Sequence, residues 1–233
     1  MNHFFITGIH TGVGKSVMTG LIARAFLNLE RSTITQKWVQ SGDLDQPDIS
    51  IHDTMLKTAH VFDTEIQSAR TVYQFPTSLA PHLSAKVANV SINPSIICDK
   101  FTFLSKRFSH VLVEGSGGLM VPLTENTLFL DLVKKLNLAV IIVADPYLGA
   151  INHTLLTYHA LHMFNLKCVC IIINEVTQNI SPWIVDEFYK TLKHSLPIPI
   201  FGPIPNKKTT GVLDYFENKI EKQLVDILLK TVE

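Results

Sequence analysis

The chain has 233 residues, 46% of them hydrophobic, and its 20 basic side chains balance 20 acidic ones, so the formal net charge is zero. This length fits one large domain or two small ones with ample material for a buried core, and we expect a single domain over residues 1–233. Zero net charge leaves no electrostatic footprint for nucleic acid or for an anionic membrane. We therefore expect neither as a partner.

The sequence also indicates the cellular compartment. The N-terminus has no basic region followed by an apolar stretch, because a glycine-rich loop begins by residue 8, and no run of about 18 uncharged apolar residues follows. The cysteines Cys98, Cys168 and Cys170 lack zinc-type spacing, and their odd count in apolar surroundings indicates buried, reduced thiols. We expect a cytoplasmic protein.

The strongest motif is the loop Gly-Ile-His-Thr-Gly-Val-Gly-Lys-Ser over residues 8–16, between an apolar strand at 3–7 and a helical pattern at 17–27. Such glycines let backbone N–H groups converge on a polyphosphate, while Lys15 reaches the outer phosphates and Ser16 ligates Mg²⁺. Five residues separate Gly8 from Gly14, one more than usual, so the flanking strand and helix carry the assignment. The loop predicts a nucleoside-triphosphate site; a glycine turn without a ligand is the alternative.

A second predicted strand, residues 32–40, carries Lys37 near its carboxyl end. Ligands in open parallel sheets bind at the carboxyl ends of strands, so Lys37 either points at the same phosphates as Lys15 or is a solvated lysine. The polar loop over 41–48 holds three aspartates. Its carboxylates either complete a Mg²⁺ shell or open the helix predicted over 49–56.

The middle of the chain supplies a second candidate ligand. A proline-containing loop over 73–82 and helices over 83–87 and 94–107 precede a strand that ends at Glu114. Three glycines in the next four residues follow that glutamate. This arrangement suits a second Mg²⁺ ligand beside a backbone cradle for an anion, with a tight structural turn as the alternative.

Strands and helices alternate to the end of the chain. The predicted strands lie at 138–144, 169–173 and 197–201, and a loop at 202–205 follows the last one. Helices are predicted at 128–136, 182–192 and 212–229. A further helix follows the loop at 145–153 and ends at residue 164. Asn174 closes one of these strands, where its amide suits a nucleotide base edge or a turn. The alternation predicts an α/β fold of the P-loop NTPase type, with a mostly parallel sheet of six or seven strands and helices on both faces.

Together these motifs resemble the dethiobiotin synthetase family, the ATP-dependent carboxylases of biotin biosynthesis, over nearly the whole chain. The family's glycine loop reads Gly-Thr-Asp-Thr-x-Val-Gly-Lys-Thr, with the same extra residue. The strand with Lys37, the Val-Glu-Gly-x-Gly-Gly segment at 113–118 and the Leu-Gly-Ala-Ile-Asn-His segment at 148–153 are also similar, and the last is the most specific.

The resemblance implies a reaction of ATP, CO₂ and 7,8-diaminopelargonic acid to dethiobiotin, ADP and phosphate, with Mg²⁺ as cofactor. It implies a carbamate on one amine, then a carbamic-phosphoric anhydride, before the second amine closes the ring. It also implies a homodimer in which the segment 149–152 reaches the substrate of the neighbouring subunit.

The resemblance also implies residue roles. Lys15 and Lys37 are the catalytic pair, and Ser16, Glu114 and Asp48 hold the metal, with Asp53 as the alternative to Asp48. The ATP-binding positions are Gly12, Val13, Gly14, Lys15, Ser16, Val17, Glu114, Gly117, Asn174, Pro203 and Ile204. The substrate-binding positions are Thr11, Ser41, Gly149, Ala150, Ile151 and Asn152.

The chain departs from the family pattern at three places: His10 replaces a common Asp, Gly12 a frequent Glu, and Trp38 the proline after the strand lysine. His10 also separates the chain from the main alternative class, the P-loop switch and partitioning ATPases, which carry a signature lysine at that position. Glutamine-dependent amide-forming synthetases need an additional glutaminase domain with a nucleophilic cysteine, for which this chain is too short. A nucleotide-binding module without catalysis remains a further alternative.

Overall fold

In the computed structural model, which describes residues 3–57, 62–206 and 209–232, seven strands form one parallel sheet. Their order is β3-β2-β4-β1-β7-β8-β9, which confirms the expected α/β fold. The strands are β1 (Phe4–Gly8), β2 (Thr33–Ser41), β3 (Thr71–Phe75), β4 (His110–Glu114), β7 (Ala139–Ala144), β8 (Cys168–Asn174) and β9 (Ile200–Ile204). A separate antiparallel pair, β5 (Pro122–Thr124) and β6 (Thr127–Leu128), follows β4.

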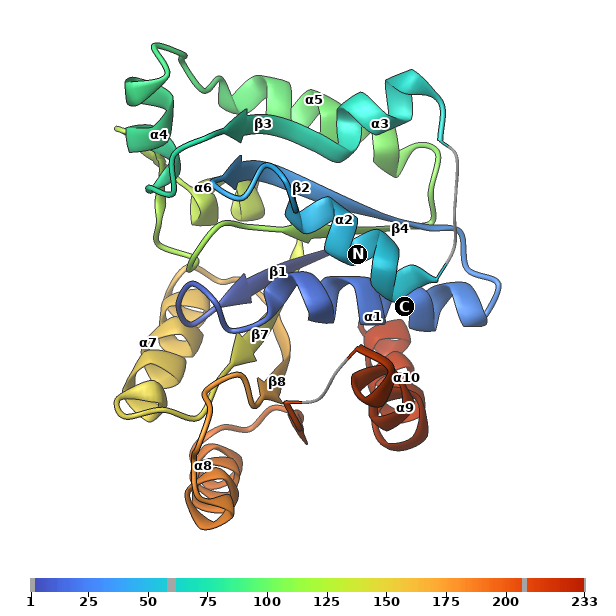
Figure 1. Cartoon of the computed structure of the whole chain (residues 1–233), viewed down its shortest axis with the longest axis vertical. Helices are drawn as coiled ribbons and strands as arrows, with labels where there is room; N and C mark the ends of the chain where they lie inside the picture. The colour runs from blue at the N-terminus through green and yellow to red at the C-terminus, as the bar shows by residue number, and fades with distance from the viewer. Residues whose placement is uncertain (1–2, 58–61, 207–208, 233) are drawn as a thin grey trace.

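Helices cover both faces of this sheet (Figure 1). One face packs against α1 (Lys15–Asn28), α2 (Asp48–Leu56), α9 (Thr209–Lys219) and α10 (Glu221–Val232). The other packs against α3 (Thr64–Arg70), α4 (Pro81–Val87), α5 (Pro94–Ser105), α6 (Phe129–Lys135), α7 (Ala150–Met163) and α8 (Pro182–Ser195). None of the helices in the described part of the chain is long and apolar enough to cross a membrane.

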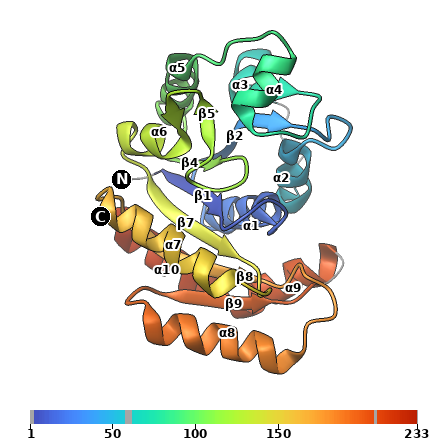
Figure 2. The same cartoon turned by 90° about the vertical axis from the view of Figure 1, so that its left-hand side faces the viewer.

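The central strands show why this sheet forms. β7 reads Ala-Val-Ile-Ile-Val-Ala and is buried at every position, as a parallel strand covered on both faces requires. β1 is buried throughout and lies between β4 and β7. Because every strand of this sheet runs the same way, all carboxyl ends meet at one edge, which lies at the left in Figure 1 and faces the viewer in Figure 2.

Helix α2 approaches α1 closely, and a glycine makes this possible. A Cβ atom at Gly20, in the middle of α1, would lie 2.6 Å from Met55 Cβ and 2.9 Å from the His52 carbonyl oxygen. Glycine inside a helix costs about 1 kcal/mol relative to alanine, so close packing is the reason for its presence here. The contact holds α2 against α1, with Asp48 at the start of α2 beside the carboxyl edge of the sheet.

Several local expectations were wrong, two of them at the edge strands β3 and β9, where pairing with a distant segment decides the structure. Residues 73–75, predicted as loop, belong to β3, which pairs with β2. The last strand lies at Ile200–Ile204 rather than 197–201, so Pro203 belongs to a strand. Proline has no N–H to donate to a neighbouring strand, and it is tolerated here because β9 is at the edge of the sheet. The last predicted helix is two helices that divide at Ile220, and α3 was not predicted.

Candidate active site

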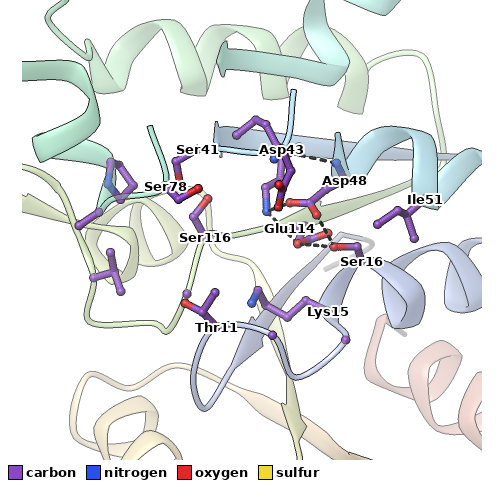
Figure 3. Close-up of a pocket in the computed structure, with 18 of the residues that line it drawn as sticks. Thr11, Lys15, Ser16, Ser41, Asp43, Asp48, Ile51, Ser78, Glu114 and Ser116 are labelled. Carbon is purple, nitrogen blue, oxygen red and sulfur yellow. Dashed lines mark hydrogen bonds and ion pairs between the residues drawn. The ribbon is translucent and has the colours of Figure 1, made fainter. Parts of the chain in front are cut away.

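The loops that follow β1, β2, β3 and β4 enclose a cavity of about 630 Å³ at the carboxyl edge of the sheet (Figure 3). Many of the residues expected to bind ATP, metal or substrate meet here, although they are distant in the sequence. They are Thr11, Gly12, Gly14, Lys15, Ser16, Val17, Lys37, Ser41, Asp48, Glu114 and Gly117.

The glycine loop forms one wall and ends where α1 begins. Gly14 precedes Lys15 with φ of 85°, in the left-handed region that favours glycine, and a Cβ atom there would collide with the Asn174 amide. Lys15 is only 6% exposed, and burial lowers its pKa, an effect to which the neighbouring Lys37 adds. The loop thus presents backbone N–H groups and one cation to the cavity.

A buried charge cluster forms the floor of the cavity. Lys37 and Glu114 are register partners on β2 and β4, and Lys37 Nζ lies 2.8 Å from Glu114 Oε1. The same Nζ lies 2.5 Å from Asp48 Oδ2 and donates to the Gly115 carbonyl at 3.0 Å. One ammonium therefore bridges two carboxylates that come from different elements.

The pKa shifts in this cluster follow from burial and from its charges. Burial alone raises the pKa of Glu114, but Lys37, the hydrogen bond with His52 and Lys15 outweigh it and hold that pKa well below its usual range. Burial likewise opposes the charge on Lys37, but the carboxylates of Glu114 and Asp48 outweigh it and raise its pKa. Lys37 and Glu114 are therefore both charged at neutral pH.

The Ser16 hydroxyl connects α1 to both carboxylates. Its Oγ donates to Asp48 Oδ1 at 2.7 Å and to Glu114 Oε1 at 3.1 Å. A hydroxyl and two carboxylates are the oxygen ligands that suit Mg²⁺, which takes the rest of its shell from phosphate and water. Within the described ranges no group of three or more His, Cys, Asp or Glu side chains could hold a metal by itself. The donor set therefore fits a nucleotide-bound Mg²⁺ rather than a protein-only cage.

The two candidate aspartates on α2 have different surroundings. Asp48 opens the helix, lines the cavity, and is held there because its backbone N–H donates to Gln40 Oε1 at 3.0 Å. Asp53 pairs with the buried Arg70, whose Nη2 lies 2.5 Å from Asp53 Oδ1, and does not line the cavity. The structure thus groups Asp48, and not Asp53, with Ser16 and Glu114.

The side of the cavity away from Ser16 carries hydroxyls. Figure 3 shows Ser41, Ser78 and Ser116 grouped there, with Thr11 on the glycine loop below them. Asp43, from the acidic loop proposed as a source of metal ligands, also lines the cavity. Sequence reasoning missed several lining residues, namely Gln40, Ile51, Ser78, Leu79, Ala80, Pro81, Ser116 and Val121. Most of them come from the proline-containing loop after β3 and the glycine cluster after Glu114, while Gln40 lies on β2 and Ile51 on α2.

The residues expected around the nucleotide base do not line this cavity. Asn174 Nδ2 donates to the Val13 carbonyl at 2.9 Å, which supports the glycine loop from behind. Pro203 lines a separate cavity of about 610 Å³ with Glu175 and Ile180. Val13 and Ile204 are fully buried.

The segment 149–152 also lies apart from the main cavity, at the start of α7. Gly149 and Ile151 line a groove of about 320 Å³ with Leu148 and Trp183, while Asn152 is exposed and Ala150 is buried. Except for Ala150, the segment therefore lies at the surface of the chain.

The first strand of the parallel sheet leads through a glycine loop into a helix that begins with Lys and Ser. This arrangement defines a P-loop nucleotide-binding protein. A family model described as an AAA domain matches residues 2–211. The ATP-dependent dethiobiotin synthetase BioD 2 of Haemophilus influenzae is 34% identical over 73% of this chain and 89% of the relative. The ATP-dependent dethiobiotin synthetase BioD of Geobacillus sp. is 31% identical over 97% of this chain and 96% of the relative. This chain belongs to the ATP-dependent dethiobiotin synthetase family and is a ligase.

Solved structures show the same fold at greater distance. A ParA family ATPase from Chlorobium tepidum superposes with a TM-score of 0.53 at 17% identity, covering 98% of this chain and 97% of that one. This likeness concerns the fold alone. At the position of the signature lysine of partitioning ATPases stands His10, whose ring packs edge-on against Tyr147 at a centroid distance of 4.7 Å.

The two aspartates of α2 give a matched pair of variants. Asp48→Asn should weaken Mg²⁺-dependent ADP binding by about tenfold or more, because it removes a carboxylate from the proposed metal site. Asp53→Asn should leave that binding within about twofold and instead lower the free energy of unfolding by about 1–3 kcal/mol, because the buried Arg70 loses its partner. Calorimetric titration with ADP and urea unfolding measure both; the reverse pattern would move the metal ligand to Asp53.

Proposed function

We propose that this chain makes dethiobiotin from 7,8-diaminopelargonic acid and CO₂ in a single P-loop domain, at the expense of ATP and with Mg²⁺. Family membership supports the overall conversion. The observation that carries the proposal is the convergence of Lys15 and Lys37 on one cavity, where Ser16, Asp48 and Glu114 line one side and hydroxyls the other. Such a cavity can hold a triphosphate next to a polar second substrate.

The proposed chemistry has three steps. One amine of the diamine attacks CO₂ and loses a proton, which gives a carbamate. A carbamate oxygen attacks the γ-phosphorus and ADP leaves, which gives a carbamic-phosphoric anhydride. The second amine attacks the carbonyl carbon of that anhydride, phosphate leaves with the electrons of the broken C–O bond, and loss of a proton completes the ureido ring.

Lys15 and Lys37 provide positive charge at the reacting groups. Lys15 opens α1 and is proposed to reach the outer phosphates. Lys37 lies in the middle of β2, opposite the last residue of β4, and is proposed to stabilise the carbamate and the γ-phosphate. Phosphoryl transfer needs little covalent help from a protein, so positioning and neutralisation of charge are the main contributions. The raised pKa of Lys37 keeps it cationic for this role.

Ser16, Asp48 and Glu114 are proposed to hold Mg²⁺, which when bound neutralises charge on the phosphates. Backbone groups of the glycine loop and of Gly117 would cradle the phosphates, with Val17 beside them. The base would lie near Asn174, Pro203 and the backbone of Ile204. Thr11 and Ser41 would hold the diamine and its carbamate.

The segment 149–152 supports a homodimer. Leu148 is fully exposed and Trp183 is 69% exposed beside the same groove, and apolar surface of this kind is normally covered by another protein surface. We propose that a second copy covers it, so that Gly149, Ala150, Ile151 and Asn152 contribute to the substrate site of the partner. The proposal includes no nucleic-acid or membrane partner and places the enzyme in the cytoplasm.

Replacing the lysine of β2 tests the mechanism. Lys37→Ala should reduce dethiobiotin formation by at least about 10²-fold, because the carbamate and γ-phosphate lose their cation, while ADP affinity stays within a few-fold. Mass spectrometry of the product and calorimetry with ADP measure the two quantities. Near-normal turnover in this variant would remove Lys37 from the mechanism.

A subunit-mixing experiment tests the shared site. Lys37→Ala and Asn152→Ala chains are each expected to be inactive as homodimers. Mixed by co-expression, they should regain about a quarter of wild-type activity, because half of the dimers are mixed and each contains one site with both native residues. If Asn152 instead serves the site of its own subunit, no mixed dimer contains an intact site and the mixture stays inactive.

A further inference from the structure

Histidine 52 on α2 is fully buried and takes no part in the mechanism described above. Its Nε2 lies 2.6 Å from Glu114 Oε2, while its Nδ1 is buried without a hydrogen-bond partner among the described residues. Because Glu114 is a carboxylate, the short contact requires a proton on Nε2. The only polar contact of this ring, in the described part of the chain, therefore goes to Glu114.

The two oxygens of Glu114 have different partners as a result. Oε1 receives Ser16 Oγ at 3.1 Å and Lys37 Nζ at 2.8 Å, on the cavity side. Oε2 is occupied by His52. A carboxylate at the end of a side chain can rotate, and a partner on Oε2 fixes the orientation in which the other oxygen is directed at Ser16.

The packing of α2 makes this contact possible. Gly20 of α1 lies against the His52 backbone, and a Cβ atom on residue 20 would lie only 3.1 Å from His52 Cα. Because glycine lets α2 approach α1 this closely, the His52 imidazole reaches Glu114 at the end of β4. Asp48 begins the same helix, one turn earlier. Helix α2 thus supplies one proposed metal ligand directly and orients the other through His52.

We propose that His52 is a positioning residue, which fixes the Glu114 carboxylate so that Oε1 faces the Mg²⁺ site formed with Ser16 and Asp48. The inference rests on the metal role of Glu114 in the proposed function. Groups that hold a metal ligand by a hydrogen bond contribute to metal affinity although they never touch the ion. His52 does so from a helix that packs against α1, where the glycine loop ends.

The test compares ADP affinity in the presence of Mg²⁺ and in EDTA, by calorimetry on the full chain. In wild type, Mg²⁺ should tighten ADP binding. In His52→Leu this gain should shrink by about tenfold or more, while affinity in EDTA changes by less than about twofold, because only the metal ligand is disturbed. His52→Phe, which keeps a ring but has no donor, should behave in the same way.

Two variants separate positioning from general damage to the fold. His52→Gln places an amide N–H near the position of Nε2 and should restore the Mg²⁺ gain to within about threefold of wild type. His110→Leu removes another buried imidazole, stacked on Phe26 at the opposite end of β4, and should leave the gain unchanged. The Mg²⁺ concentration for half-maximal turnover should rise in His52→Leu, and excess Mg²⁺ should recover its rate.

The contrary results are distinct. If wild type binds ADP equally well with Mg²⁺ and in EDTA, the metal assignment fails and the role of His52 fails with it. If wild type shows the gain and the variants without a donor keep it, or if His110→Leu loses it equally, the positioning role alone is wrong. Failure of His52→Gln to restore the gain when it folds as wild type would also overturn the role.

Discussion

The pair formed by Lys37 and Glu114 is the interaction on which the site depends. Both side chains are almost inaccessible to solvent, and parallel pairing places them opposite each other on adjacent strands. Removal of one partner from such a pair leaves a buried charge, which costs about 3–5 kcal/mol, so the two charges require each other. The surrounding polar groups each add a contact to one member of this pair: Asp48 contacts Lys37, and Ser16 and His52 contact Glu114.

The topology of the sheet brings these groups together. β2, β4 and β1 are neighbours in the sheet although long segments separate them in the chain. Glu114 ends β4 and the glycine loop follows β1, while Lys37 lies in the middle of β2, where the register places it opposite Glu114. Helices α1 and α2 then close one side of the cavity and bring Ser16 to Glu114, and Asp48 to Ser16 and Lys37. Strand β8 and its neighbour β9, at the edge of the sheet, carry the residues proposed for the base. The segment proposed for a second subunit lies at the start of α7.

Much of this arrangement could be predicted from the sequence because its signals are local. A few consecutive residues are enough to predict the glycine loop, the buried strands β7 and β8, and the strand that ends at Glu114. The edge strands β3 and β9 lack such a local signal. Each has one neighbouring strand and is only partly buried, so its residues resemble those of a loop.

Contacts between distant segments could not be predicted in the same way. Asp48 and Asp53 lie on one helix, and only its packing sends the first to Ser16 and the second to Arg70. His52 has no local signal for its bond to Glu114, which depends on the close approach of α2 to α1 at Gly20. The contribution of Ser78 to the cavity likewise follows from the course of the loop after β3.

The central claim is that the energy of ATP is used on a carbamate of the diamine. The most direct measurement is phosphate release by the purified protein with ATP, Mg²⁺ and bicarbonate, with and without 7,8-diaminopelargonic acid, while dethiobiotin is followed by mass spectrometry. The account predicts release that requires the diamine and equals the dethiobiotin formed. Slow release that is indifferent to the diamine, without dethiobiotin, would contradict it and indicate a switch ATPase with the same fold.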